Sequence, residues 1–66
     1  MMKDTLNGRE IIIEFHTIGA FMKVSAIDAK TLTEISIQGP ATAPQAMLQR
    51  NALKRLEYVL KKKNLI

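Results

Sequence analysis

The sequence predicts an α+β fold in which a three-stranded antiparallel β-meander packs against one C-terminal amphipathic α-helix. Two observations predict it. Apolar and polar residues alternate with a period of two through residues 11–18, 21–28 and 33–38, which is typical of strands with one buried face. Apolar residues then recur at helical spacing from about residue 44 to residue 63, which indicates a helix with one buried stripe.

The first predicted strand ends at Ile18 and is rich in β-branched isoleucine, which favours a strand. Gly19 follows as the first residue of a two-residue loop, where glycine suits a type II′ turn. This turn sets Ile18 opposite Phe21, and the same register sets Ile12 opposite Ile27. The register keeps the apolar residues of each face together, whereas a shift by one residue would mix the two faces.

A four-residue loop leads to the third predicted strand, with Asp28 opposite Thr33. Leu32 occupies the last position of this loop, where a left-handed backbone is often needed and glycine is preferred, so we expect local strain there. Gly39 and Pro40 are expected to end the strand.

The predicted helix runs from Pro44 to about Lys63. Thr42 is its expected N-cap, with Gln45 as the capping-box partner three residues later. The helix should cover one face of the sheet. The expected core consists of Ile11, Ile13, Phe15, Val24, Ala26, Ile35 and Ile37 under Leu53, Leu56 and Leu60.

The length and composition favour one cytoplasmic domain. We place this domain at residues 9–66, after a flexible N-terminal segment at 1–8. The chain of 66 residues has no cysteine, which excludes disulfides and thiolate metal sites and suits a reducing compartment. Its longest apolar run, Ile11–Ile13, is far shorter than a signal peptide or a membrane span requires, so we expect no membrane association.

No arrangement of residues predicts catalysis. His16 is the single histidine, and it shares a strand face with Glu14. Such a pair could move a proton or hold a metal weakly, but a solvated polar sheet face is the commoner explanation. The chain has no nucleophile elbow and no glycine-rich phosphate loop. We therefore expect no enzyme activity, no catalytic residue, no metal and no cofactor.

The positive charge is concentrated in the predicted helix. Residues 44–66 have a net charge of +5 and the rest of the chain has −1. A basic stripe can bind nucleic-acid phosphates, although Glu57 can pair with neighbouring lysines and basic last turns also stabilise helix dipoles. The candidate basic contact face, which includes an exposed tyrosine, consists of Arg50, Lys54, Arg55, Tyr58, Lys61, Lys62 and Lys63.

The sheet face that the helix cannot cover is the least ordinary feature. The predicted register places Ile12 opposite Ile27 and Ile18 opposite Phe21 on this face. These four residues form the candidate self-association face, and they predict a homodimer. Pairing along the edge of the isoleucine-rich strand is an alternative geometry, because few charges protect that edge.

The runs IIIEFHTIG, MKVSAID, TEISIQGP and ALKRLEYVL resemble a family of short bacterial proteins of unknown function. The resemblance covers roughly Ile11 to Leu60 and implies the same strand-strand-strand-helix order. The chain departs from the family pattern at Leu32, where the pattern has glycine. The resemblance implies no activity. We therefore expect a small non-enzymatic interaction or regulatory protein that works through protein contacts, with nucleic-acid binding by the basic helix as the alternative.

Overall fold

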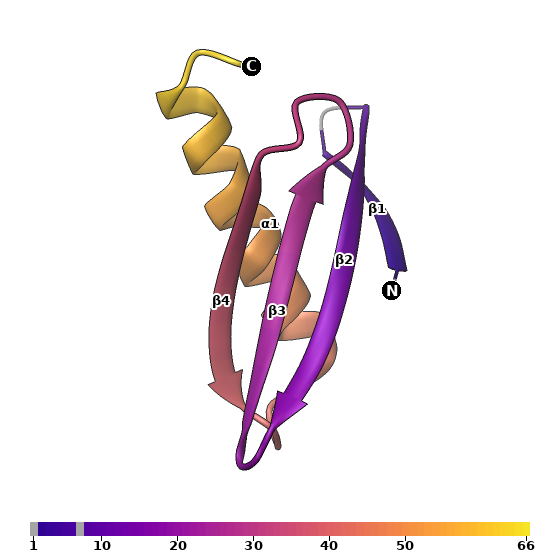
Figure 1. The fold of residues 1–66 in the computed structure, drawn as a ribbon, viewed down its shortest axis with the longest axis vertical. Coiled ribbons are helices and arrows are strands. Elements are labelled where there is room, and N and C mark those ends of the chain that lie inside the picture. The colour runs from indigo at the N-terminus through magenta and orange to yellow at the C-terminus, as the bar shows by residue number, and fades with distance from the viewer. Residues whose placement is uncertain (1, 7) are drawn as a thin grey trace.

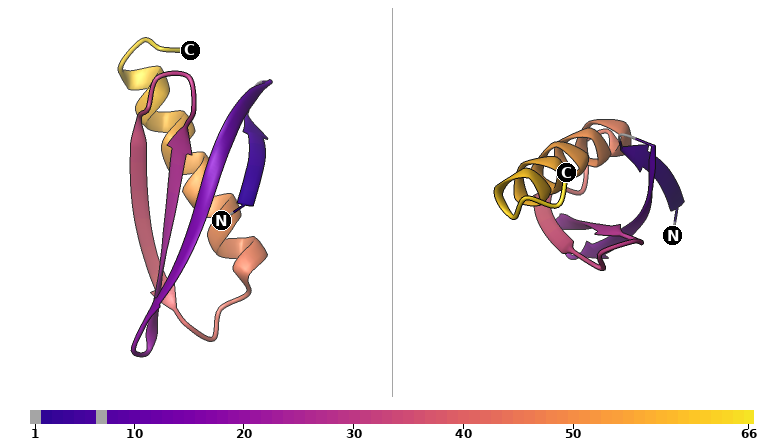
Figure 2. Two further views of the ribbon diagram at one scale, coloured as in Figure 1. Left: turned by 45° about the vertical axis from the view of Figure 1, so that its right-hand side comes forward. Right: turned by 90° about the horizontal axis from the view of Figure 1, so that it is seen from above.

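The computed structural model describes the backbone of residues 2–6 and 8–66, and the side chains of residues 5, 6 and 8–66. Its strands follow one another across one antiparallel sheet in the order β1-β2-β3-β4, and α1 packs against β3 and β4 (Figure 1). Figure 2 shows the sheet curled around the helix, with β1 and β4 at its two edges. The elements are β1 (Met2–Leu6), β2 (Arg9–Ile18), β3 (Phe21–Asp28), β4 (Glu34–Pro40) and α1 (Gln45–Lys62).

The predicted hairpin register is confirmed. Ile18 pairs with Phe21 and Ile12 pairs with Ile27 across β2 and β3. Gly19 has a φ of 59°, and Ala20 is not in the positive-φ region, which is the sign pattern of a type II′ turn. The alternation of the two strands therefore places one apolar set under the helix and leaves the other on the opposite face.

The sheet has four strands, so the prediction of three was wrong. Residues Met2–Leu6, which fall within the segment predicted to be flexible, form β1 and pair antiparallel with Arg9–Ile13 of β2. The sequence MKDTL has few β-branched residues and therefore carries a weak local strand signal. Its strand conformation depends on the free edge of β2, which a local pattern does not reveal.

Strand β4 continues through Gly39 and Pro40, where the sequence predicted a break. Gly39 pairs with Met22 and Pro40 pairs with Phe21. Proline is tolerated here because β4 is an edge strand. A Cβ atom on Gly39 would lie 2.5 Å from Leu48 Cδ2, so glycine lets α1 approach β4 closely.

The start of the helix differs from the prediction. The N-cap of α1 is Pro44, and no side chain caps the helix, so the assignment of Thr42 as the cap was wrong. The Pro44 carbonyl accepts the first helical hydrogen bonds, from the amides of Met47 at 3.1 Å and Leu48 at 3.2 Å. Thr42 lies two residues too early for its hydroxyl to accept hydrogen bonds from these amides.

The end of the helix has a Schellman motif, which the sequence did not predict. Asn64 adopts a φ of 59°. Its amide donates to the Lys61 carbonyl at 3.0 Å, and the Leu65 amide donates to the Leu60 carbonyl at 2.8 Å. This turn ends the helix and directs residues 65 and 66 back toward the sheet.

The core lies between α1 and the concave face of the sheet. Most of the predicted core residues are buried, while Phe15, Ile35, Ile37 and Leu53 are only half-buried at its margin. The helix contributes residues four apart along one stripe, so Leu48 and Ala52 join the predicted Leu56 and Leu60. The buried apolar residues are Ile11, Ile13, Met22, Val24, Ala26, Leu48, Ala52, Leu56 and Leu60.

Leu32 has the predicted left-handed backbone, with a φ of 61°. Its amide donates to the Asp28 carbonyl at 2.7 Å, and the Asp28 amide donates to the Thr33 carbonyl at 2.8 Å, which closes the loop between β3 and β4. The Leu32 side chain is 76% exposed. The loop therefore imposes an unfavourable backbone on a side chain that packs little.

Candidate functional site

The sheet face opposite α1 carries the predicted self-association residues, and we call it the far face. Ile12 pairs with Ile27 at one end of it, and Ile18 pairs with Phe21 at the other. Ile18 and Phe21 are 57% and 58% exposed, whereas Ile12 and Ile27 are half-buried. The structure brings these four residues together as two apolar pairs, separated along the strands by about 20 Å, and not as one continuous patch.

Polar residues fill the middle of the far face. Glu14 pairs with Ser25, and His16 pairs with Lys23. Ser25 is buried, and its hydroxyl lies 3.0 Å from that of Ser36 on β4. Glu14 and Lys23 are half-buried and His16 is exposed. Glu14 and His16 thus share one face, as predicted, but each stands opposite a different residue of β3.

The predicted free edge of the isoleucine-rich strand is only partly free. β1 pairs with Arg9–Ile13 and so occupies this half of the β2 edge. In the described part of the chain, residues 14–18 pair with β3 alone. A continuous sheet that joins two copies along the whole of β2 would therefore require β1 to separate from β2.

A buried ion pair, which the sequence reasoning missed, lies at the end of the sheet near the loop of Leu32. The Asp28 side chain is completely buried, and Arg9 donates to both of its carboxylate oxygens, from Nε at 3.2 Å and from Nη2 at 2.8 Å. Thr31 donates to Oδ2 from its amide at 3.1 Å and from its hydroxyl at 2.6 Å. Arg9 Nη1 also lies 3.5 Å from the Leu65 carbonyl, so one side chain joins β2, the loop and the end of α1.

These contacts shift the pKa values of both side chains. The Arg9 guanidinium, helped by the two Thr31 donors, holds the pKa of Asp28 well below its usual range, although burial acts in the opposite direction. The Asp28 carboxylate in turn raises the pKa of Arg9. A signal was present in the sequence: Asp28 stands opposite Ile11 on the face toward the core, where a carboxylate needs a partner.

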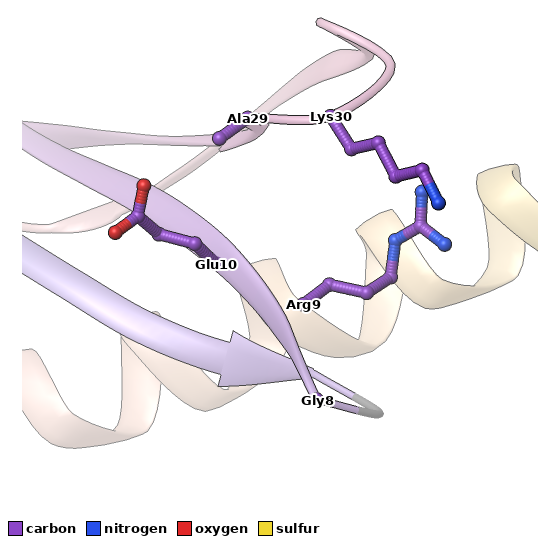
Figure 3. Close-up of a pocket in the computed structure, with 5 residues that line it drawn as sticks. All are labelled: Gly8, Arg9, Glu10, Ala29 and Lys30. Atoms are coloured by element: carbon purple, nitrogen blue, oxygen red, sulfur yellow. The ribbon is translucent and has the colours of Figure 1, made fainter.

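An open hollow of about 540 Å³ adjoins this ion pair and is lined by Gly8, Arg9, Glu10, Ala29 and Lys30. In Figure 3 the Lys30 side chain extends toward the Arg9 guanidinium, and the Glu10 carboxylate points away from both. Because Asp28 already neutralises Arg9, this arrangement is that of a structural ion pair.

The basic contact face lies on the outer side of α1, and part of its charge is engaged within the chain. The Arg55 guanidinium and the Lys62 ammonium lie 5.5 and 5.7 Å from the centre of the Tyr58 ring. Lys61 lies 3.7 Å from Glu57, as the spacing of four residues predicted. The other members of this face, Arg50, Lys54 and Lys63, are exposed.

Two further observations concern metal binding and membrane crossing. Among the residues that the structure describes, no three histidine, aspartate or glutamate side chains gather where they could hold a metal ion. Over the same described ranges, no helix has the length and apolar character needed to cross a membrane.

The fold and its surfaces define a small α+β domain whose accessible features are an uncovered sheet face and a basic helix. The chain belongs to a family described as a domain of unknown function, DUF6898, whose sequence model matches residues 8–63. This match confirms the predicted resemblance to a family of unknown function, and the bacterial origin of that family stays a prediction. The matched region contains β2, β3, β4 and α1, and β1 lies outside it. Comparison with curated proteins and with solved structures gave no significant match.

Proposed function

We propose that this protein is a small, non-enzymatic interaction protein of the cytoplasm that acts through protein contacts and forms a homodimer through its far face. The observation that carries the proposal is the pair Ile18 and Phe21, more than half exposed and adjacent on a regular sheet. A 66-residue domain has a small core, and association is one common way of adding burial.

The exposed area sets the expected strength of the dimer. Burying the exposed half of Ile18 or Phe21 contributes ~1 kcal/mol, and the half-buried Ile12 and Ile27 contribute less. The loss of translational and rotational freedom on association offsets much of this gain. We therefore expect a weak, reversible dimer with a dissociation constant between high micromolar and millimolar, and not an obligate one.

The proposal is tested by sedimentation velocity from low micromolar to near-millimolar concentration. The wild-type protein should move from monomer to dimer over this range. Phe21→Lys should keep the protein monomeric, because it places a charge within the apolar pair with Ile18. Met47→Lys is the matched control: Met47 is 43% exposed, but it lies on α1, away from the far face, so this variant should associate like the wild type.

A wild-type protein that stays monomeric throughout would overturn the proposal. So would a Phe21→Lys variant that associates normally. Circular dichroism of each variant checks that the fold is intact, so that loss of association is not loss of structure.

The basic contact face supports the second candidate function, nucleic-acid binding, because Arg50, Lys54 and Lys63 are exposed. The ion pair of Lys61 with Glu57, which offsets one charge of this face, supports ranking it second. We expect duplex DNA or RNA to bind no tighter than the ~10⁻⁴–10⁻⁶ M of non-specific contact at physiological salt. A sequence-selective nanomolar complex that weakens steeply with salt would reverse the ranking.

A further inference from the structure

We propose that the open hollow beside the Arg9–Asp28 pair binds a phosphate group, held between the Arg9 guanidinium and the Lys30 ammonium. The hollow has a volume of about 540 Å³, which is ample for such an anion. Arg9 lies on the same face of β2 as the core residue Ile11, because the two are separated by two positions. The proposal is therefore independent of self-association through the far face.

Arg9 keeps hydrogen-bond donors for a second anion. A guanidinium has five N–H groups. Asp28 accepts from two of them, on Nε and Nη2, and the Leu65 carbonyl accepts at most one more, from Nη1 at 3.5 Å. At least one N–H group therefore remains on each Nη atom. The contact with both carboxylate oxygens, and a side chain only 15% exposed, fix the orientation of the guanidinium, so these donors are preorganised.

Lys30 brings a second positive charge to the hollow. Its side chain extends from the loop toward the Arg9 guanidinium (Figure 3), and it forms no ion pair with any residue that the structure describes. Asp28 offsets one of the two cations. Glu10 also lines the hollow, but its carboxylate points away from both cations, since Glu10 lies on the far-face side of β2 with Ile12. The hollow therefore keeps one positive charge without a counter-ion, which favours an anion.

The shape of this donor set favours phosphate over carboxylate. Two N–H groups of a guanidinium fork match two oxygens of either anion. A tetrahedral phosphate has a third oxygen outside the plane of the fork, to which Lys30 can donate, whereas a planar carboxylate has none. Phosphate also carries up to two negative charges near neutral pH and so gains from both cations.

The experiment is a titration of the wild-type protein with inorganic phosphate, followed by two-dimensional ¹H–¹⁵N NMR spectra at neutral pH and low salt. Saturable shifts should appear at the amides of residues 8–10 and 29–31 and at the Arg9 Nε signal, with a dissociation constant of ~1 mM. Sodium chloride at matched ionic strength should not produce these shifts. Sodium acetate should bind at least about fivefold more weakly, because it lacks the third oxygen and the second charge.

Variants of Lys30 test its role without disturbing the ion pair. Lys30→Gln should weaken phosphate binding about fivefold to tenfold, because it removes one charge-assisted hydrogen bond, and Lys30→Arg should retain binding. Lys54→Gln is the matched control: it removes the same charge from the exposed surface of α1 and should bind phosphate within about twofold of the wild type. Lys30 is itself exposed, so the Tm of each variant should equal that of the wild type.

A second titration, with glycerol 3-phosphate, identifies the form in which phosphate binds. Three phosphate oxygens of this ester are free, and the hollow is open on one side for the esterified group. Binding as tight as that of inorganic phosphate supports a phosphate ester as the ligand, and binding of inorganic phosphate alone supports the free anion.

Four results would overturn the proposal. Phosphate shifts confined to the basic contact face, equal shifts with sodium chloride, or equal affinities of the wild type and Lys30→Gln would each show that the hollow is not an anion site. Acetate binding as tight as phosphate binding would show that the donors do not select phosphate.

Discussion

Replacing Leu32 by glycine should stabilise the protein. Leu32 has a φ of 61°, and a left-handed backbone costs a residue with a Cβ atom about 1–2 kcal/mol. Glycine avoids this cost, but it loses more conformational freedom on folding, which reduces the gain in stability by ~0.5–1 kcal/mol. The side chain is 76% exposed, so its removal sacrifices little packing. The net gain is about 0.5–1 kcal/mol, or a rise of roughly 3–6 °C in Tm for a domain of this size.

Thermal unfolding followed by circular dichroism measures this gain, with Leu32→Ala as the matched control. Alanine removes the exposed side chain but keeps the Cβ atom, so its Tm should stay close to that of the wild type. Leu32→Asn should lie between the two, because asparagine tolerates the left-handed region better than most residues. A Leu32→Gly Tm equal to or below that of Leu32→Ala would refute the attribution of strain to this backbone.

Three further substitutions test other parts of the structure by urea unfolding. Arg9→Met should lower the midpoint at pH 7. It should also reduce the stability that the wild type loses as pH falls through and below the ordinary aspartate pKa of about 4, because the hydrogen bond from Arg9 is the largest of the contacts that lower the pKa of Asp28; equal pH profiles would contradict this. Thr42→Ala should change the free energy of unfolding by less than ~0.3 kcal/mol, whereas a capping residue would cost about 1 kcal/mol. Gly39→Ala should cost about 1–3 kcal/mol, because the new methyl group displaces the buried side chain of Leu48, and an unchanged midpoint would show that this side chain moves aside without cost.

The central hairpin could be predicted because two independent constraints agree. The turn at Gly19 fixes one register, and the alternation of apolar residues accepts only that register. Leu32 was predictable for a related reason, since the length of its loop sets the backbone that the last position must adopt. The helix was recognisable from its repeat, and its limits were placed within one residue at each end.

The features that sequence reasoning missed depend on distant parts of the chain. β1 forms because β2 offers a free edge, and the Arg9–Asp28 pair spans 19 residues. The Thr42 assignment failed because a suitable residue and spacing do not fix where the backbone becomes helical, and Pro44 begins the helix instead. The far face was predicted as a set of residues, but the wide separation of its two apolar pairs follows only from the strand geometry.

The short strand β1 also protects the edge of β2 against aggregation. It occupies the hydrogen-bonding edge of Arg9–Ile13, a stretch with three consecutive isoleucines. Unprotected edges of this composition act as templates on which further chains add as strands, the first step of cross-β aggregation. Proteolysis before Arg9 would leave the helix and its contacts with β3 and β4 in place but expose this edge. We therefore expect such a cut to promote aggregation of a chain that still contains its helix.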